Sequence, residues 1–442
     1  MSSPLASAAF RRLFAAQLCS LLAVGLLTVA LSLAAWRIGG ESGGGQLLGL
    51  LLLLKMVAYV GLAPLAQPLL AGRSRKRTMV GLDLGRLLLL LPMGLASDTW
   101  QLVLLVFLFF TLTAAFTPLF QSLIPEVLPD EQTYSRALAW SRVAYTLESI
   151  MSPVIAVLLL GWADVEQLFP LAALCLLGSV LMLLSTRFPT EVDMTSTQRF
   201  FARAVRGITI FRHTPRLRGL FLLNVALSLI MAWVLVNTVV YAGSRLGDAE
   251  GQFPLLMACL GLGAAASALW VPSLVRRFGE RTVMLSGVFA FAGIAASFAL
   301  FPGPPVLALY GIWFSFGVAS SLTLTPGGLV LTRSASRRDR TAVFAAHFSL
   351  SHAGWMLAYP LAGWLVAQVS LERALLLLSA CGTLVAYVAA RSWPSNDPAE
   401  RRHEHPELPV DHPHLVEAPV IGTNHSHAHA FHVDELHPRW PS

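Results

Sequence analysis

The chain has 442 residues, of which 55% are hydrophobic and only 12% are charged, whereas soluble globular proteins contain about 25% charged residues. This composition excludes an ordinary soluble domain, and the net charge of +7 does not indicate a nucleic-acid partner, because the basic residues lie beside long apolar segments. The sequence has no Walker loop or other glycine-rich phosphate loop and no catalytic constellation, so we expect neither an enzyme nor a bound cofactor.

Twelve apolar segments follow one another along the chain, and each is long enough to cross a hydrocarbon core of about 30 Å as a helix. They comprise residues 13–36, 46–70, 79–97, 101–123, 139–161, 168–187, 217–240, 252–274, 282–301, 305–331, 341–368 and 373–391. The first segment is too long for the apolar region of a signal peptide and lacks a small-residue cleavage site. The sequence therefore predicts an all-α membrane protein with twelve transmembrane helices.

Basic residues are distributed unevenly among the loops. They gather before the first predicted helix, after the second, eighth and tenth, and between the sixth and seventh, while the alternate loops are mainly acidic. Because cytoplasmic loops of membrane proteins are enriched in Lys and Arg, this distribution predicts that both termini and the central loop are cytoplasmic. We expect a multi-pass protein of the inner membrane, surrounded by the lipid bilayer.

The sequence contains an internal repeat. Residues 68–78 resemble residues 272–282 at an offset of 204 residues, and the same offset relates Arg136 to Arg340. This repeat predicts two parallel six-helix halves that are related by pseudo-symmetry. The predicted units are an N-terminal half (residues 1–187), a cytoplasmic linker (188–216), a C-terminal half (217–391) and a tail (392–442).

Two short motifs lie in the loops of this repeat. Residues 277–281 read Arg-Phe-Gly-Glu-Arg and resemble the basic loop between helices 2 and 3 of the major facilitator superfamily. The copy in the first half lacks the Asp that is usual in that family. Residues 123–129 resemble the drug-exporter branch of the family, which includes macrolide and siderophore exporters. The resemblance implies the major facilitator fold and a gating or structural role for Arg277 and Arg281.

Ionisable residues are rare within the predicted helices, where each costs roughly 2.5–3.5 kcal/mol to insert. Glu148 lies nine residues into its helix, which is ~14 Å and close to the midplane, and the repeat offset pairs it with His352. A carboxylate and an imidazole suit a divalent cation, and desolvation favours the neutral form of both, which suits proton exchange. Competition between H⁺ and a metal ion for this one site would be the coupling step of an antiporter. The alternative is that Glu148 forms a hydrogen bond to a neighbouring helix and that the histidine is an ordinary packing residue of the eleventh predicted helix.

Four of the other ionisable residues within the predicted helices are also candidates for a functional or structural role. Lys55 is also near the midplane, where an ammonium group could balance Glu148 in an empty site. His347 lies five residues before His352, nearer the cytoplasmic side, and is a candidate first ligand for a cation. Asp83 and Arg86 are one helical turn apart and are expected to form a structural or gating pair.

The tail differs in composition from the rest of the chain. Residues 392–442 are polar and Pro-rich with no hydrophobic period, so we expect them to be disordered. They contain nine of the twelve histidines, namely His403, His405, His412, His414, His425, His427, His429, His432 and His437. Neutral imidazole binds Ni²⁺, Cu²⁺, Zn²⁺ and Co²⁺, and the tail has no Cys for a Cu(I) site. The tail therefore predicts metal binding, while sensing, buffering and delivery remain open as its role.

A major facilitator body with a His-rich cytoplasmic tail is similar to bacterial nickel-resistance exporters of the Nre type. That resemblance implies metal resistance through proton-coupled efflux of Ni²⁺, Co²⁺ or another divalent transition metal across the inner membrane. The alternative is an exporter of a drug, siderophore or other organic compound, and a membrane metal sensor is a third class. The expected partners are a small ion as substrate and the lipid bilayer, with the protein acting as a monomer.

Overall fold

The computed structural model describes residues 4–62, 74–96, 98–128, 131–186, 197–301, 303–336, 339–397, 401–404, 420–421, 424–429, 433 and 440. The first half contains η1 (Pro4–Ala6), α1 (Ala8–Val57), a π-helical turn η2 (Ala58–Leu62), α3 (Arg75–Met93), α4 (Thr99–Val127), α5 (Glu131–Leu160), η3 (Val165–Gln167) and α6 (Leu168–Ser185). The second half contains α8 (Pro215–Leu246), α9 (Ala249–Ala268), α10 (Val271–Phe278), α11 (Glu280–Leu300), α12 (Val306–Leu324), α13 (Gly327–Arg333), α14 (Arg340–Gln368) and α15 (Leu371–Ser392).

Helix α1 contains two membrane-crossing arms that are joined by a sharp bend at Gly40. This residue has φ 57° and ψ −152°, in a region that residues with a Cβ atom rarely adopt. At Gly39 an added Cβ would lie 2.3 Å from the amide nitrogen of Gly44, so the chain reverses tightly here. The first arm holds the predicted segment 13–36 and the second begins the predicted segment 46–70, whose last residues lie outside the described part.

As far as the structure describes them (residues 63–70 of the second range are not described), the twelve predicted ranges are helical. By length and composition alone, eight helical segments of the described residues could cross a membrane, and the first of them, Ala8–Leu62, contains both arms of α1. The other three ranges are occupied by α3, α5 and α14, which carry the ionisable residues discussed above except Lys55. The all-α membrane fold predicted from the apolar segments is therefore confirmed.

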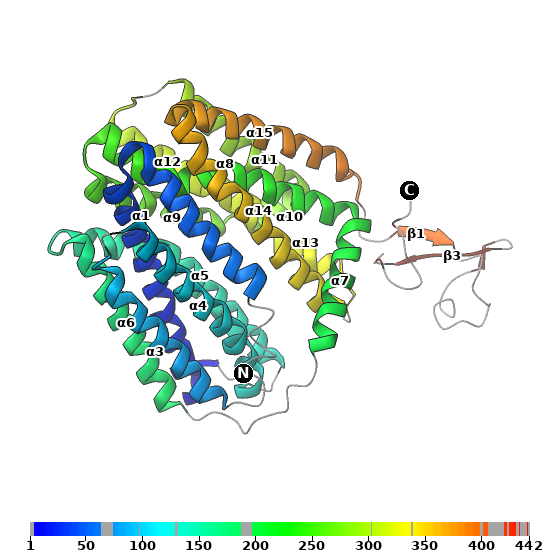
Figure 1. Ribbon diagram of the computed structural model, residues 1–442. Helices are drawn as coiled ribbons and strands as arrows, with labels where there is room; N and C mark the ends of the chain where they lie inside the picture. The colour runs from blue at the N-terminus through cyan, green and yellow to red at the C-terminus, as the bar shows by residue number, and fades with distance from the viewer. Residues whose placement is uncertain are drawn as a thin grey trace.

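The two halves have equivalent internal packing. In the first half α1 packs on α6, and α3 packs on α4 and α6; in the second half α8 packs on α15, and α11 packs on α12 and α15. The halves meet where α1 lies against α14 and where α5 lies against α9. Figure 1 shows the two bundles side by side, with the first half in blue to cyan and the second in green to orange.

Small residues allow the second arm of α1 to approach α14 closely. An added Cβ on Gly49 would lie 2.7 Å from the carbonyl oxygen of Tyr359, and one on Gly363 would lie 2.2 Å from that of Gly45. Because lipid provides no hydrophobic drive for helix association, such backbone contact is a main source of packing energy in a membrane. This contact places the residues of the second α1 arm beside those of α14.

The linker between the halves contains α7 (Thr197–His213), which packs along α14. At Gly207 an added Cβ would lie 2.2 Å from the carbonyl oxygen of Ala342. Arg206 forms an ion pair with Asp339, in which its second guanidinium nitrogen donates to Oδ2 at 2.8 Å. The linker is thus fastened to the start of α14.

The tail contains a small antiparallel sheet. Strands β1 (Arg401–Glu404), β2 (Val420–Ile421) and β3 (Asn424–His429) are arranged in the order β1-β3-β2. His403 is paired with His427, and Val420 is paired with His425. Most of residues 398–442 lie outside the described residues, so the predicted disorder of the tail stays a prediction.

Candidate transport site between the two halves

Lys55, Glu148 and His352 come together from three helices and both halves. Lys55 lies near the end of α1, Glu148 on α5 and His352 on α14. Lys55 interacts electrostatically with both Glu148 and His352. All three side chains are partly buried. The structure therefore brings together three of the four residues predicted for transport and proton coupling.

The hydrogen bond of His352 defines its tautomer. Its Nδ1 atom lies 2.7 Å from the carbonyl oxygen of Phe348. A carbonyl oxygen accepts, so Nδ1 carries the hydrogen and a neutral imidazole keeps its lone pair on Nε2. The His352 ring also contacts the Phe348 ring, with 3.9 Å between the ring centroids. Nε2 is thus the atom that can take a proton or bind a metal ion.

Aromatic rings surround this group of charges. The Nζ atom of Lys55 lies 5.2 Å from the ring centroid of Phe110 and 5.9 Å from that of Tyr59. The Tyr59 ring is 6.0 Å from the His352 ring and 6.2 Å from the Phe110 ring. Tyr59 lies in the π-helical turn η2, a rare element that is frequent at functional sites. The sequence analysis did not identify Tyr59 or Phe110, because an aromatic residue in an apolar segment carries no signal of its partners.

Gly25 and Ser152 form the wall beside Glu148. An added Cβ on Gly25 would lie 1.8 Å from the Ser152 hydroxyl and 3.0 Å from Glu148 Oε1. Glu148 and Ser152 are four residues apart and so share one face of α5. Within the described residues, the buried Ser152 hydroxyl has no hydrogen-bond partner. The close approach of α1 to α5 therefore requires glycine at position 25.

His347 lies beside the linker helix. Its ring stacks on Phe211 of α7, with 6.2 Å between the centroids and an interplanar angle of 15°. It also interacts electrostatically with His352. Its role as a first ligand for a cation stays a prediction.

Asp83 and Arg86 form a fully buried ion pair inside the first half. Asp83 accepts a hydrogen bond of 2.6 Å from Ser179 of α6, and Arg86 donates one of 3.1 Å to Ser20 of α1. The Arg86 guanidinium also lies 4.4 Å from the ring centroid of Phe116 on α4. These contacts tie α3 to three neighbouring helices, which favours the structural alternative over a gating role.

Arg277 and Arg281 lie within the second half. Arg281 donates hydrogen bonds of 2.8 Å to the carbonyl oxygens of Ala390 and Trp393, which are at the end of α15. Arg277 lies over the ring of Phe278, 5.1 Å from its centroid. Both arginines thus have partners on their own half, and Arg281 caps the last turn of α15.

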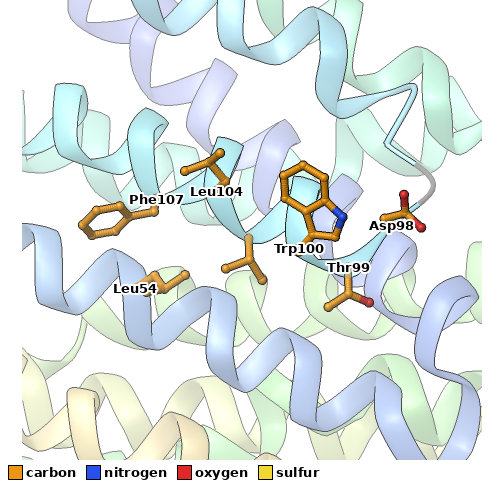
Figure 2. Close-up of a pocket in the computed structure, with 7 residues that line it drawn as sticks. Leu54, Asp98, Thr99, Trp100, Leu104 and Phe107 are labelled. Carbon is orange, nitrogen blue, oxygen red and sulfur yellow. The ribbon is translucent and has the colours of Figure 1, made fainter.

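A cavity of about 630 Å³ lies between the second arm of α1 and α4 (Figure 2). Its lining is Leu54, Asp98, Thr99, Trp100, Val103, Leu104 and Phe107. Trp100 is 65% exposed, so the cavity opens toward the outside of the bundle. Leu54 precedes Lys55, yet the ionisable cluster is not part of the lining. The cavity is therefore separate from the candidate transport site.

The described residues contain no group of three or more His, Cys, Asp or Glu side chains that could hold a metal ion. Of the predicted tail ligands, His403, His425, His427 and His429 lie in β1 and β3. The other five, His405, His412, His414, His432 and His437, lie outside the described residues.

Two arginines connect the halves at the predicted periplasmic end, where the Gly40 bend lies. Arg37 of the first half pairs with Glu166 and, at 2.7 Å, with Glu250 of the second half. Arg245 of the second half pairs with Glu372 at 3.1 Å and with Glu41 of the first half at 3.6 Å. Each arginine thus bonds one glutamate of its own half and one of the other, which makes a pseudo-symmetric clasp of six residues.

The pKa of Glu166 reflects its place in this clasp. Partial burial raises the pKa, but hydrogen bonds from its own backbone and from Arg37, together with the charge of Arg37, outweigh burial and lower the pKa below its usual range. The carboxylate form is therefore favoured by the folded protein.

Comparison with known proteins shows that residues 13–316 and 226–428 match the family model described as Major Facilitator Superfamily. Macrolide efflux protein A of Streptococcus pyogenes is 25% identical over 225 residues, which cover 49% of this chain and 54% of that protein. The chain thus spans about half the length of that relative. An uncharacterised MFS-type transporter of Sinorhizobium fredii is 26% identical over 284 residues, which cover 62% of this chain and 67% of that protein.

Solved structures show the same fold. The nucleoside transporter NupG superposes with a TM-score of 0.69 at 12% identity, covering 88% of this chain and 100% of that one. A bacterial homologue of the human lysosomal transporter Spinster, in an inward-facing and unoccupied conformation, has a TM-score of 0.68 at 17% identity, covering 87% and 97%.

Proposed function

Because the chain belongs to the major facilitator superfamily, we propose that it is a proton-coupled exporter of a divalent transition metal, Ni²⁺ or an ion of similar ligand preference, across the bacterial inner membrane. The observation that carries the proposal is that Glu148 of the first half and His352 of the second half both lie within electrostatic reach of Lys55. A site with one ligand on each half is suited to alternating access, because movement of one half against the other opens and closes it.

Proton coupling follows from competition for the same lone pairs. A carboxylate oxygen of Glu148 and Nε2 of His352 can each hold either a proton or the metal ion. The ammonium group of Lys55 balances Glu148 in the empty site and opposes a second cation. Protonation of Glu148 from the periplasm would therefore release the metal ion, and loss of that proton to the cytoplasm would restore the site.

The tail supports the choice of a metal ion as substrate. Residues 425, 427 and 429 are at alternate positions of β3 and so share one face of the sheet. His403 is paired with His427, and directly opposed residues lie on the same face. By this register the four histidines of the described strands share one face, although they do not form a preassembled metal site. Imidazole ligands follow the Irving–Williams order, so they do not distinguish Ni²⁺ from Cu²⁺ or Zn²⁺.

A second candidate function is export of an organic compound. It is favoured by the macrolide efflux relative and by the rings of Tyr59, Phe110 and Phe348 around the charged groups. Rings of this kind stack on the apolar part of an amphiphilic substrate, and Glu148 could bind its amino group.

Transport by purified protein in inside-out proteoliposomes separates the two candidates. We expect Ni²⁺, Co²⁺ or Zn²⁺ uptake that depends on an imposed pH gradient and is accompanied by proton release. Glu148→Gln and His352→Ala should each abolish this uptake. The matched controls are His213→Ala, which removes a partly buried histidine whose Nδ1 atom contacts the carbonyl oxygen of Thr209 on its own helix α7, and Met151→Leu on the exposed face of α5. Macrolide transport without any metal transport would reject the metal proposal in favour of the second candidate.

A further inference from the structure

Both ends of the histidine-rich segment meet at one buried arginine. Arg216 is in the first turn of α8 and is only 3% exposed. Its NH1 atom lies 3.7 Å from Oδ2 of Asp397, which precedes the segment. Its guanidinium carbon lies 4.7 Å from the ring centroid of Trp440, which follows the segment. In Figure 1 β1 and β3 lie beyond the end of the helical bundle.

Further contacts hold each end in place. The backbone carbonyl of Asp397 accepts a hydrogen bond from Arg333 of α13. Val433 is 5% exposed and belongs to the main hydrophobic core, against which Trp440 also packs. The attachment therefore combines charge, a cation–π contact and apolar burial at the predicted cytoplasmic end of the second half.

The position of Arg216 is unfavourable without these partners. A cation in the first turn of a helix opposes the helix dipole, and burial removes the guanidinium from water. The carboxylate of Asp397 and the indole ring of Trp440 offset both effects. The two ends of the tail therefore both contribute to stabilising this buried arginine.

We propose that Arg216 is an anchor that closes the histidine-rich segment into a loop at the cytoplasmic mouth of the transporter. All nine tail histidines lie between Asp397 and Trp440, which are 43 residues apart. A flexible chain of that length would have an end-to-end distance of roughly 33–39 Å, whereas both ends here contact the same side chain. The consequence of this anchor rests on the proposed metal export. Metal ions captured by the loop stay near the transport site, which raises their local concentration there.

The attachment can be tested apart from transport. Trp440→Ala and Arg216→Lys should each speed trypsin cleavage after Arg401 and Arg402 by about five- to tenfold in the full-length protein in nanodiscs, because the loop is released. Lysine keeps the charge but lacks the planar group that stacks on indole. Trp440→Phe should retain most of the protection. The matched control is Tyr387→Ala, which removes an exposed ring 5.7 Å from Arg391. Unchanged cleavage in both test variants would overturn the anchor.

The role of the attachment is measured by Ni²⁺ transport. Trp440→Ala should raise the apparent KM by about three- to tenfold and leave kcat unchanged, since the ionisable cluster is intact. Faster cleavage with an unchanged KM would overturn local capture while leaving metal export standing. If the wild-type protein transports no metal ion, the proteolysis result still decides whether Arg216 anchors the tail, so failure of the two proposals can be distinguished.

Discussion

Removal of the two ion pairs that cross the halves should open the predicted periplasmic end. The perturbation is the double substitution Glu41→Gln and Glu250→Gln, which leaves Arg37 and Arg245 paired only within their own halves. The four side chains of these pairs are 37–62% exposed, so each pair contributes about 0.2–1 kcal/mol rather than the larger energy of a buried pair. Two independent pairs then contribute about 0.4–2 kcal/mol. The ratio of open to closed molecules should rise by a factor of about 2–30.

The assay is pulsed electron paramagnetic resonance on a protein without its four native cysteines. Spin labels at Trp162 and Phe301 report the distance across this end, because the two exposed residues belong to different halves. The control is Glu166→Gln with Glu372→Gln, which removes the same charge but keeps both cross-half pairs. Salt at 1 M, where the Debye length is about 3 Å, should reproduce the effect of the test variant. Equal distance distributions in the test and control variants would refute the reasoning.

Three further outcomes are expected. Asp83→Asn should lower the stability of the detergent-solubilised protein by about 3–5 kcal/mol, because it leaves Arg86 buried without its carboxylate partner; a loss below about 1 kcal/mol in thermal unfolding would show that the pair is dispensable. The pKa of Glu166 is lowered in the folded protein. Its pairing with Arg37 therefore contributes fully to the stability of the folded protein above the ordinary glutamate pKa of about 4.3, and this contribution is lost as the pH falls through the lower folded pKa. Loss of the infrared carboxylate band of Glu166 already above pH 5 would contradict this. Deletion of residues 400–442 should reduce metal tolerance without abolishing transport, and complete loss of transport would make the tail obligatory.

Some of the candidate site could be predicted from the sequence. An ionisable residue in an apolar segment stands out by composition, which identified Lys55, Glu148 and His352. The repeat offset placed the last two at equivalent positions in the two halves. Tyr59 and Gly25 could not be found in this way, because an aromatic residue or a glycine in an apolar helix looks the same whether it faces lipid or the site. The helix α7 carried a detectable signal, since apolar residues recur along 197–213 with a helical period.

The sequence by itself determined the membrane spans, their pairing into two halves and the accumulation of histidine in the tail. These properties depend on the length of apolar segments and on local composition, and neither needs knowledge of distant contacts. Only the tertiary structure decided which charges meet. Arg37 and Glu250 are more than two hundred residues apart, as are Arg216 and Trp440. The first contact arises from the packing of one half against the other and the second from the packing of the tail on the second half, and no local pattern encodes either.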